Sequence, residues 1–470
     1  MPAIVLFNSS TGSDSSASGT PTAEGTVLSG VITAVATNTF DWDAGGVPNY
    51  DLNQFTAGNH VVYCADPAAG APNFLRVTGI ALNSGTTYRV TTDGNVPAGW
   101  NGLTFYIGGK RLSLTGSSKL FRNNSSIGDM MFGSQPILAE MESGYTETLT
   151  ATPGVIGLSF QAATAAQTKG RMILRGAANA AVRPVITYPS TVQALQIGEY
   201  CELANFDLVC SNGAKGSLVG VDCVRRAVDN RMVVLRNLKI TGAGYGVDHS
   251  GNLYGYMDRV WVSGSATCGV RTQAFGFSCD GCWFDANGVN YQATGDGSNN
   301  IFVNCIFSNG TRGFQASGVG THTPTAQDRF LVARGCVFHN NSTAGISSAN
   351  SNAANHRSFQ WQVENCQFTN NGTGILFNAA ATAAYLNAVN CTIRNCNFSG
   401  NTLDITAACD IREDCTAVAP AYQNAAAGDF RSSPLARRGF PRSVVWASQP
   451  PIVANIGVPF SAGTGFGRFR

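Results

Sequence analysis

The sequence predicts an all-β solenoid, a parallel β-helix with three short strands per rung. A four-residue phrase recurs through the middle of the chain: a turn residue, an apolar residue, a variable residue and a second apolar residue. The seven copies begin at Asn237, Arg259, Gly281, Asn304, Gly335, Asn365 and Asn395. The steps between them are 22, 22, 23, 31, 30 and 30 residues. This period, with β-rich patterning, is typical of a solenoid.

Each phrase predicts one strand, because its two apolar positions are two residues apart and face the same side. A second apolar column follows nine or ten residues later, as at Val270 and Phe314, and a third apolar stretch precedes several copies, as at 301–303. Polar turns join the three. We expect about eleven rungs between roughly residues 145 and 425, or on the order of 50 Å of rod. The Asn or Gly that opens most phrases predicts a left-handed turn conformation there.

The phrase resembles the repeat of right-handed parallel β-helix proteins, the pectate-lyase-like group. The resemblance covers the larger part of the chain and implies the fold and its handedness. It implies little about chemistry, because this fold hosts lyases, hydrolases, epimerases, adhesins and viral spikes.

Three regions are predicted. Residues 1–125 form an N-terminal arm and a small β domain for attachment or capping, residues 126–429 form the β-helix, and residues 430–470 form an Arg- and Pro-rich C-terminal tail. Two segments of the first region, residues 7–14 and residues 106–111, resemble segments of uncharacterised β-helix proteins encoded by tailed bacteriophages. That resemblance implies a virion protein.

Composition narrows the function classes. Charged residues make up 12% of the 470 residues and the formal net charge is +2, so no basic stripe predicts nucleic-acid binding. No apolar run reaches the 18 residues that a membrane span needs. The start lacks the basic and long apolar regions of a signal peptide. We therefore expect a protein made in a host cytoplasm and located in the virion, with no cofactor.

The cysteines predict a buried column of thiols. Five of the 14 occupy the inward position of the phrase, where Leu238 and Val260 also occur: Cys282, Cys305, Cys336, Cys366 and Cys396. A thiol behaves there as a small buried hydrophobe. The alternative is a zinc site at Cys279 and Cys282, but no second CxxC or suitably spaced His follows, so no metal is expected.

Hydrolysis of a glycosidic bond needs two carboxylates on one outward face. The candidate catalytic residues are Asp248, His249, Asp258 and Asp285, with Asp280 nearby. Asp258 and Asp280 precede the phrase at a position that Arg also occupies, which is typical of a solvated turn. The sequence therefore favours a protein without enzymatic activity.

One outward column is apolar instead of polar. Trp261, Trp283, Ile306 and Val337 occupy equivalent positions on successive copies of the phrase. Three interpretations stay open: a loop or the C-terminal tail covers the column, a subunit interface covers it, or it is a stacking platform for sugar rings. The interface would suit a homotrimer.

The C-terminal tail contains no acidic residue and no Lys, but it has six Arg and five Pro. It packs along its own rod or docks on an acidic neighbour as an extended arm. For the second case the virion-anchoring candidates are Arg437, Arg438, Arg442, Arg468 and Arg470.

The function predicted from these patterns is a structural component of a tailed-bacteriophage virion: a spike, fibre or capsid-attached protrusion. It would attach to the host surface or to the particle. Expected partners are two further copies in a homotrimer, other virion proteins and host surface polysaccharide. The first alternative is a tailspike depolymerase, a lyase or hydrolase acting on host surface glycan. The second is a non-catalytic glycan-binding adhesin.

Overall fold

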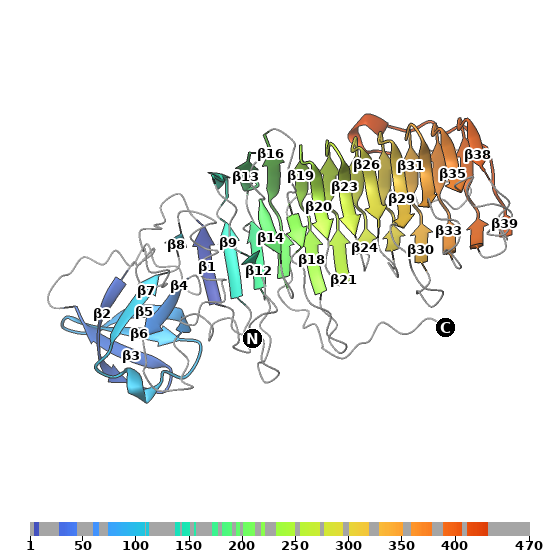
Figure 1. Ribbon diagram of the computed structural model, residues 1–470. Helices are drawn as coiled ribbons and strands as arrows, with labels where there is room; N and C mark the ends of the chain where they lie inside the picture. The colour runs from blue at the N-terminus through green and yellow to red at the C-terminus, as the bar shows by residue number, and fades with distance from the viewer. Residues whose placement is uncertain are drawn as a thin grey trace.

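The computed structural model describes residues 4–8, 28–44, 60–64, 74–108, 110–111, 137–141, 143–150, 155–156, 172–176, 181–189, 194–197, 201–211, 218–220, 232–249, 254–272, 277–294, 300–318, 329–350, 359–377, 389–406 and 411–430. Three parallel sheets run along a rod, and a small barrel lies at one end of it (Figure 1). No helix in these ranges is long and apolar enough to span a membrane.

The three sheets are built from strands that recur once per rung. Sheet 1 runs in the spatial order β8 (Lys110–Arg111), β1 (Ile4–Asn8), β9 (Ile137–Met141), β12 (Met172–Gly176), β15 (Cys201–Ala204), β18 (Met232–Arg236), β21 (Tyr254–Asp258), β24 (Phe277–Asp280), β27 (Asn300–Val303), β30 (Arg329–Arg334), β33 (Phe359–Glu364), β36 (Val389–Arg394), β39 (Ile411–Glu413). Sheet 2 runs β10 (Thr146–Thr148), β13 (Val185–Tyr188), β16 (Asp207–Cys210), β19 (Lys239–Thr241), β22 (Trp261–Ser263), β25 (Trp283–Asp285), β28 (Ile306–Ser308), β31 (Val337–His339), β34 (Gln367–Thr369), β37 (Asn397–Ser399). Sheet 3 runs β11 (Val155–Ile156), β14 (Leu195–Ile197), β17 (Leu218–Gly220), β20 (Tyr245–His249), β23 (Cys268–Thr272), β26 (Val289–Ala293), β29 (Arg312–Gly318), β32 (Ala344–Asn350), β35 (Thr373–Phe377), β38 (Leu403–Ile405).

The chain visits sheets 1, 2 and 3 in turn, so each strand pairs in parallel with its equivalent on the next rung. Crossovers between parallel strands are right-handed in nearly all proteins. The prediction of a right-handed parallel β-helix with three strands per rung is confirmed. The small N-terminal β domain is also confirmed. It is a closed antiparallel barrel of β2 (Leu28–Val35), β3 (Thr39–Asp43), β6 (Thr87–Thr92), β5 (Phe74–Ser84), β4 (His60–Cys64) and β7 (Thr104–Gly108). The described residues also include two short 3-10 helices, Ala98–Trp100 (η2) and Ala425–Ala427 (η4).

The repeat phrase sets the turn from sheet 1 to sheet 2. Its opening residue has a positive φ, for example 52° at Asn304 and 62° at Gly335, which confirms the predicted left-handed turn. The same conformation occurs at Arg259, where neither Gly nor Asn is present. The second apolar residue of each phrase points into the rod. The Phe307, Phe338 and Phe368 rings stack face to face there, with centroids 4.7 and 4.8 Å apart.

The column of thiols is confirmed. The five repeat-position cysteines are buried in the core of the rod and form no disulfide. Each Sγ lies within 3.2–3.6 Å of backbone carbonyl oxygens, as Cys336 Sγ does with the carbonyl oxygen of Phe302 at 3.5 Å. Burial raises the pKa of the Cys305, Cys366 and Cys396 thiols. These three thiols therefore pack as neutral, weakly polar groups.

The first strand of the chain belongs to the rod and not to the barrel. β1 lies in sheet 1 between β8 and β9, with Ile4 beside Ile137 on one side and Phe7 beside Lys110 on the other. The barrel is thus inserted between two neighbouring strands of sheet 1. The two segments that resemble phage proteins meet at this point, because Asn8 pairs with Arg111.

A C-terminal segment, residues 416–430, returns along the outside of sheet 2, and we call it the strap. In Figure 1 it is the red chain that includes η4 and lies along β25, β28 and β31. The Val418 N–H donates to Asn397 Oδ1 at 2.8 Å, and Tyr422 Oη donates to Gln367 Oε1 at 3.0 Å. The chain after Phe430, including the five anchoring candidates Arg437, Arg438, Arg442, Arg468 and Arg470, lies outside the described residues.

Candidate functional site

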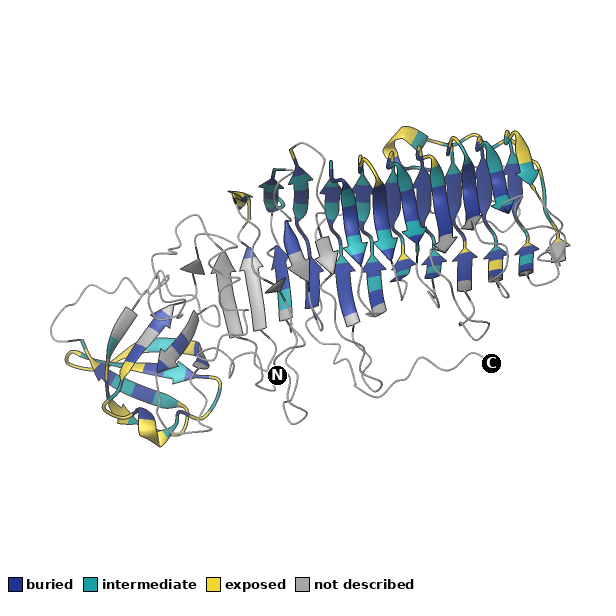
Figure 2. Cartoon of the chain, in the orientation of Figure 1, coloured by how far each residue is buried: buried dark blue, intermediate teal, exposed yellow. Residues whose placement is uncertain are grey.

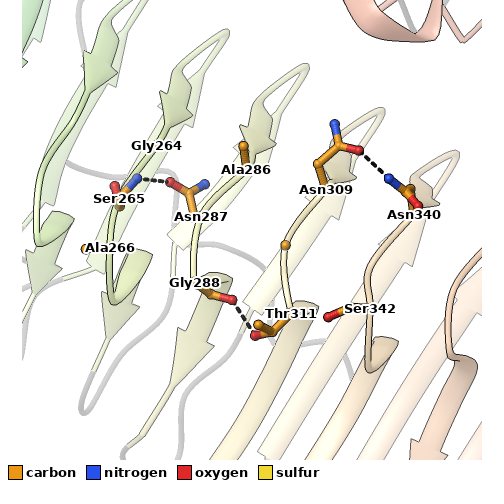
Figure 3. A pocket seen from close by; sticks show the side chains of 11 residues that line it. Gly264, Ser265, Ala266, Ala286, Asn287, Gly288, Asn309, Thr311, Asn340 and Ser342 are labelled. Atoms are coloured by element: carbon orange, nitrogen blue, oxygen red, sulfur yellow. Dashed lines mark hydrogen bonds between the residues drawn. The ribbon is translucent and has the colours of Figure 1, made fainter.

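A shallow groove of about 540 Å³ lies on the turns between sheets 2 and 3 (Figure 3). It crosses four rungs, from the β22–β23 turn to the β31–β32 turn. At a strand spacing of about 4.8 Å this is on the order of 14 Å along the rod. The lining residues are Gly264, Ser265, Ala266, Ala286, Asn287, Gly288, Asn309, Gly310, Thr311, Asn340 and Ser342. Figure 2 shows that exposed residues of the rod gather at such turns, while the strands are mostly buried.

Equivalent residues on the four rungs share a left-handed conformation. φ is 67° at Gly264, 51° at Ala286, 56° at Asn309 and 53° at Asn340. Gly and Asn adopt this conformation most readily. The chain therefore turns sharply at one place on every rung, and the turns stack into a continuous edge of the groove.

An exposed ladder of hydrogen bonds follows this edge. Asn340 Nδ2 donates to Asn309 Oδ1 at 2.8 Å, and Asn309 Nδ2 donates to Asp285 Oδ1 at 2.8 Å. The Ser308 hydroxyl also donates to Asp285 Oδ1, at 2.7 Å. The carboxylate nearest to the groove is thus held by neutral donors at the end of the ladder.

A second, buried asparagine ladder holds the floor of the groove. Asn287 Oδ1 accepts from the Ser265 N–H at 2.9 Å, and Asn341 Oδ1 accepts from the Gly310 N–H at 3.2 Å. Asn341 Nδ2 continues the ladder to Asn371 Oδ1 at 3.0 Å. Because these amides satisfy the buried backbone groups of the turns, the floor is fixed before any ligand arrives.

The groove presents amides, hydroxyls and backbone groups. Its lining residues, all within the described ranges, carry no charged side chain. Such a surface can hydrogen-bond a neutral ligand rich in hydroxyl groups. Glycoside hydrolysis needs a pair of carboxylates, and the described lining of the groove contains none.

The structure does not bring the predicted catalytic candidates together. Asp248 lies in sheet 3, where both of its oxygens accept from Arg271 at 2.8 and 2.6 Å. Asp258 lies at the end of a sheet 1 strand and Asp285 in sheet 2. His249 points into the rod and is fully buried. The alternation of the strand places Asp248 outward and His249 inward, so the two predicted residues do not share a face.

Two carboxylates do lie on neighbouring rungs, at the position that the sequence analysis interpreted as a solvated turn. Asp258 and Asp280 are register partners on β21 and β24. Both Asp258 oxygens accept from Arg259, at 2.8 Å each. Burial, and then the charge of Asp258, raise the pKa of the Asp280 carboxyl. Further along the same column the charges alternate, as in the 3.1 Å ion pair of Arg334 and Glu364.

The strap covers most of the apolar outward column. Trp283, Ile306 and Val337 are buried against Phe430, with Tyr422 and Ala425 beside them. Trp261 is half-buried at the end of the column, stacked on Trp283 with centroids 4.9 Å apart. Of the three interpretations, cover by the chain itself is the one that the structure shows. A subunit interface or a sugar platform would need exposed side chains, which Trp283, Ile306 and Val337 do not provide.

No family model and no curated protein matches the chain. Among solved structures it is similar to the A-module of mannuronan C-5 epimerase AlgE4 of Azotobacter vinelandii, with a TM-score of 0.37 and 12% identity over 62% of this chain and 89% of that chain. It is also similar to the catalytic unit of the GH87 α-1,3-glucanase of Streptomyces thermodiastaticus. The TM-score is 0.25 and the identity 10%, over 82% of this chain and 87% of that chain. A third similar structure is the tailspike protein gp49 of Pseudomonas phage LKA1. The TM-score is 0.21 and the identity 11%, over 84% of this chain and 64% of that chain. At these scores the likeness concerns the β-helix fold and not the function.

Proposed function

We propose that the protein is a structural component of a tailed-bacteriophage virion that binds a host surface glycan without cleaving it. The observation that carries the glycan part is the groove. It is a preformed, uncharged and polar surface that crosses four rungs, and hydroxyl-rich chains are the ligands that such a surface suits.

The virion part rests on the sequence and on one contact. The two segments that resemble phage β-helix proteins, residues 7–14 and 106–111, are joined by the pairing of Phe7 with Lys110 at the barrel end of the rod. This end and the Arg-rich tail are the proposed attachment points to other virion proteins. A homotrimer is the proposed assembly, and its interface would lie outside the apolar column that the strap covers.

Retention on immobilised host capsule or lipopolysaccharide tests the glycan part. The full-length protein should be retained, and mass spectrometry of the eluate should find no released oligosaccharide. The double variant Asn340→Ala and Ser342→Ala removes polar groups from the exposed edge of the groove and should lower retention about thirtyfold, because each of the two lost hydrogen bonds costs about 1 kcal/mol. Equal retention of this variant and the unaltered protein would place glycan binding elsewhere.

Glycoside hydrolysis is the second candidate, favoured by the Asp258 and Asp280 pair. Its strand spacing of about 4.8 Å is close to the carboxylate separation of retaining glycosidases. Arg259 donates to both oxygens of Asp258, while burial and the charge of Asp258 raise the pKa of the Asp280 carboxyl, so the two carboxyls differ in environment. Release of oligosaccharide by the unaltered protein, abolished in both Asp258→Asn and Asp280→Asn, would replace the non-catalytic proposal.

A further inference from the structure

We infer that the groove takes an uncharged polysaccharide chain that lies along the rod axis, about one sugar ring per rung, and is seated over Gly264 and Ala286. This rests on the proposed function, namely that the groove binds glycan. It adds the charge class of the ligand, its direction and the rungs on which it sits.

The residue at position 286 is the first step. Each described turn from sheet 2 to sheet 3 has one residue in the left-handed conformation, and these residues stack in a column along the rod. The described members of the column are Gly242, Gly264, Ala286, Asn309, Asn340, Asn370 and Gly400. Ala286 alone in this column is neither Gly nor Asn. An asparagine would adopt a φ of 51° more readily and could join the ladder that begins at Asn309. Ala286 provides neither the easier left-handed conformation nor the additional hydrogen bond, and its side chain is a single methyl group.

The neighbouring glycines are the second step. A Cβ on Gly288 would come within 2.5 Å of the Thr267 carbonyl oxygen, and one on Gly310 within 2.8 Å of Asn290 Nδ2, so packing requires both glycines. A Cβ on Gly264 would meet nothing closer than 3.7 Å. Its φ admits Asn as well as Gly, and the space above it admits a side chain. Packing therefore does not explain the bare surface at Gly264.

The polar edge beside this bare surface is the third step. Asn340 and Ser342 are exposed on the groove. In the described part of the chain, Asn340 Oδ1 and the Ser342 hydroxyl have no protein partner, so they can bond ligand hydroxyls. The groove thus combines two open rungs, where a ring can approach the backbone, with two rungs that offer an acceptor and a donor (Figure 3).

Spacing and charge are the fourth step. The rungs repeat at about 4.8 Å, comparable with the length of one pyranose unit in an extended chain. A glycan laid along the axis would meet an equivalent turn at each sugar. The Asp285 carboxylate lies beside Ala286, and no cationic side chain lines the groove within the described residues. A chain of uronic acids would be repelled there, and a neutral chain would not.

The test uses the full-length protein and titration calorimetry with two probes, neutral gluco- or manno-oligosaccharides and oligouronates, each of two to six units. Neutral chains should bind, with affinity that stops rising at about three to four units because the groove crosses four rungs. Oligouronates should bind at least tenfold more weakly.

Ala286→Asn is the decisive variant. It suits the left-handed turn and fills the seat, so the melting temperature should stay equal or rise while affinity for the neutral chain falls at least tenfold. Gly264→Asn should act in the same way and serves if the first variant folds poorly. Gly85→Asn is the matched control. It places Asn at φ 54° in an exposed barrel turn with nothing within 4 Å, and binding should not change.

The outcomes separate this inference from the proposed function. If neither probe nor host polysaccharide binds, both are wrong. If glycan binds and the Asn340 and Ser342 variant weakens it, but Ala286→Asn binds as tightly as the unaltered protein, the proposed function stands and the seat is wrong. Tighter binding of oligouronates than of neutral chains would overturn the charge class.

Discussion

Trp283 Nε1 donates a hydrogen bond of 2.8 Å to Ser308 Oγ. The same hydroxyl donates to Asp285, which accepts from Asn309 at the edge of the groove. Because Trp283 also lies under the strap, this relay connects the strap to the groove through four side chains. Loss of the strap should therefore disturb the hydrogen bonds that hold Asp285 and Asn309 at the edge of the groove.

Replacing Phe430 with Ala should loosen the strap. Truncation of a buried Phe costs about 3–5 kcal/mol, and here the loss is limited to the free energy that holds the strap on sheet 2. We expect faster proteolysis within residues 416–430 and a much smaller change in the unfolding midpoint of the rod. Gln423→Ala, an exposed strap residue, is the control and should digest like the unaltered protein. Equal digestion of the Phe430 variant would show that other contacts hold the strap.

Acid should weaken the strap through His339. Its ring contacts Phe430 and Tyr422 of the strap, with centroids 5.3 and 5.5 Å apart, and its Nδ1 lies 2.9 Å from Thr369 Oγ1. Burial lowers the pKa of His339 below 6.5, and the nearby Asp285 opposes this only in part. The folded state therefore binds the proton less readily than the unfolded state does. The contribution of neutral His339 to stability is present above pH 6.5 and is lost as the pH falls below it.

Hydrogen exchange of residues 416–430 at pH 7.5 and pH 5 measures this effect. Opening of the strap should increase at pH 5 after correction for intrinsic exchange. His339→Asn should remove most of the difference between the two pH values. A strap equally protected at both would contradict the titration of His339.

Asp280→Asn should stabilise the rod at neutral pH. The raised pKa of Asp280 means that the folded state disfavours its ionised form, partly because of the charge on Asp258. Exposed charge pairs of this kind contribute about 0.2–1 kcal/mol. In urea unfolding the gain should be present at pH 7 and should vanish near pH 3, where the carboxyl is protonated in both states. A loss of stability at pH 7 would show that hydrogen bonds to the Asp280 carboxylate outweigh the repulsion.

The five repeat-position thiols should react only after unfolding. Burial excludes reagent and raises the pKa of Cys305, Cys366 and Cys396. Iodoacetamide at pH 8 should leave them unmodified in the native protein and modify all five in denaturant without a reductant. Mass spectrometry reads both states. Disulfides that link these residues would contradict the structure.

Deleting residues 440–470 should leave the rod folded. The last described contacts are those of Phe430, so the strap stays complete in the truncated chain. Circular dichroism and the melting temperature should be unchanged, while incorporation into assembled particles should be lost. Attachment of the full-length protein should weaken with salt if Arg437 and Arg438 pair with acidic neighbours. Unfolding of the truncated chain would make the tail part of the fold.

The structure of a single rung can be predicted from the sequence, because every rung repeats the same short pattern of turn and inward-facing residues. Asn304 marks the turn and the adjacent Cys305 marks the inward-facing strand position. Six further copies of the phrase repeat this pair of positions. Contacts between rungs are harder to predict. The ladder from Asn340 to Asn309 joins residues 31 positions apart, and its partners are evident only once the rungs are in register.

The groove and the strap show what a repeat does not encode. Gly264, Ala286 and Asn309 occupy one column, and aligning the turns in this way could have indicated the groove. The cover over Trp283 could not be chosen from sequence, since Phe430 and Tyr422 belong to no repeat. The pairing of β1 with β9 was missed for the same reason. A five-residue strand, Ile4–Asn8, gives no signal of a partner beyond the barrel.

The position of β1 sets an order of events during synthesis. Ile4 leaves the ribosome before the barrel does, but its partner Ile137 follows only after the whole barrel. At typical translation rates this delay is on the order of ten seconds, far longer than a small antiparallel barrel with its own core needs to fold. The barrel should therefore be complete while β1 is still unpaired. β1 would pair with β9 only after the barrel has folded. The chain on both sides of the folded barrel would then be held in sheet 1, by β1 before it and by β8 and β9 after it.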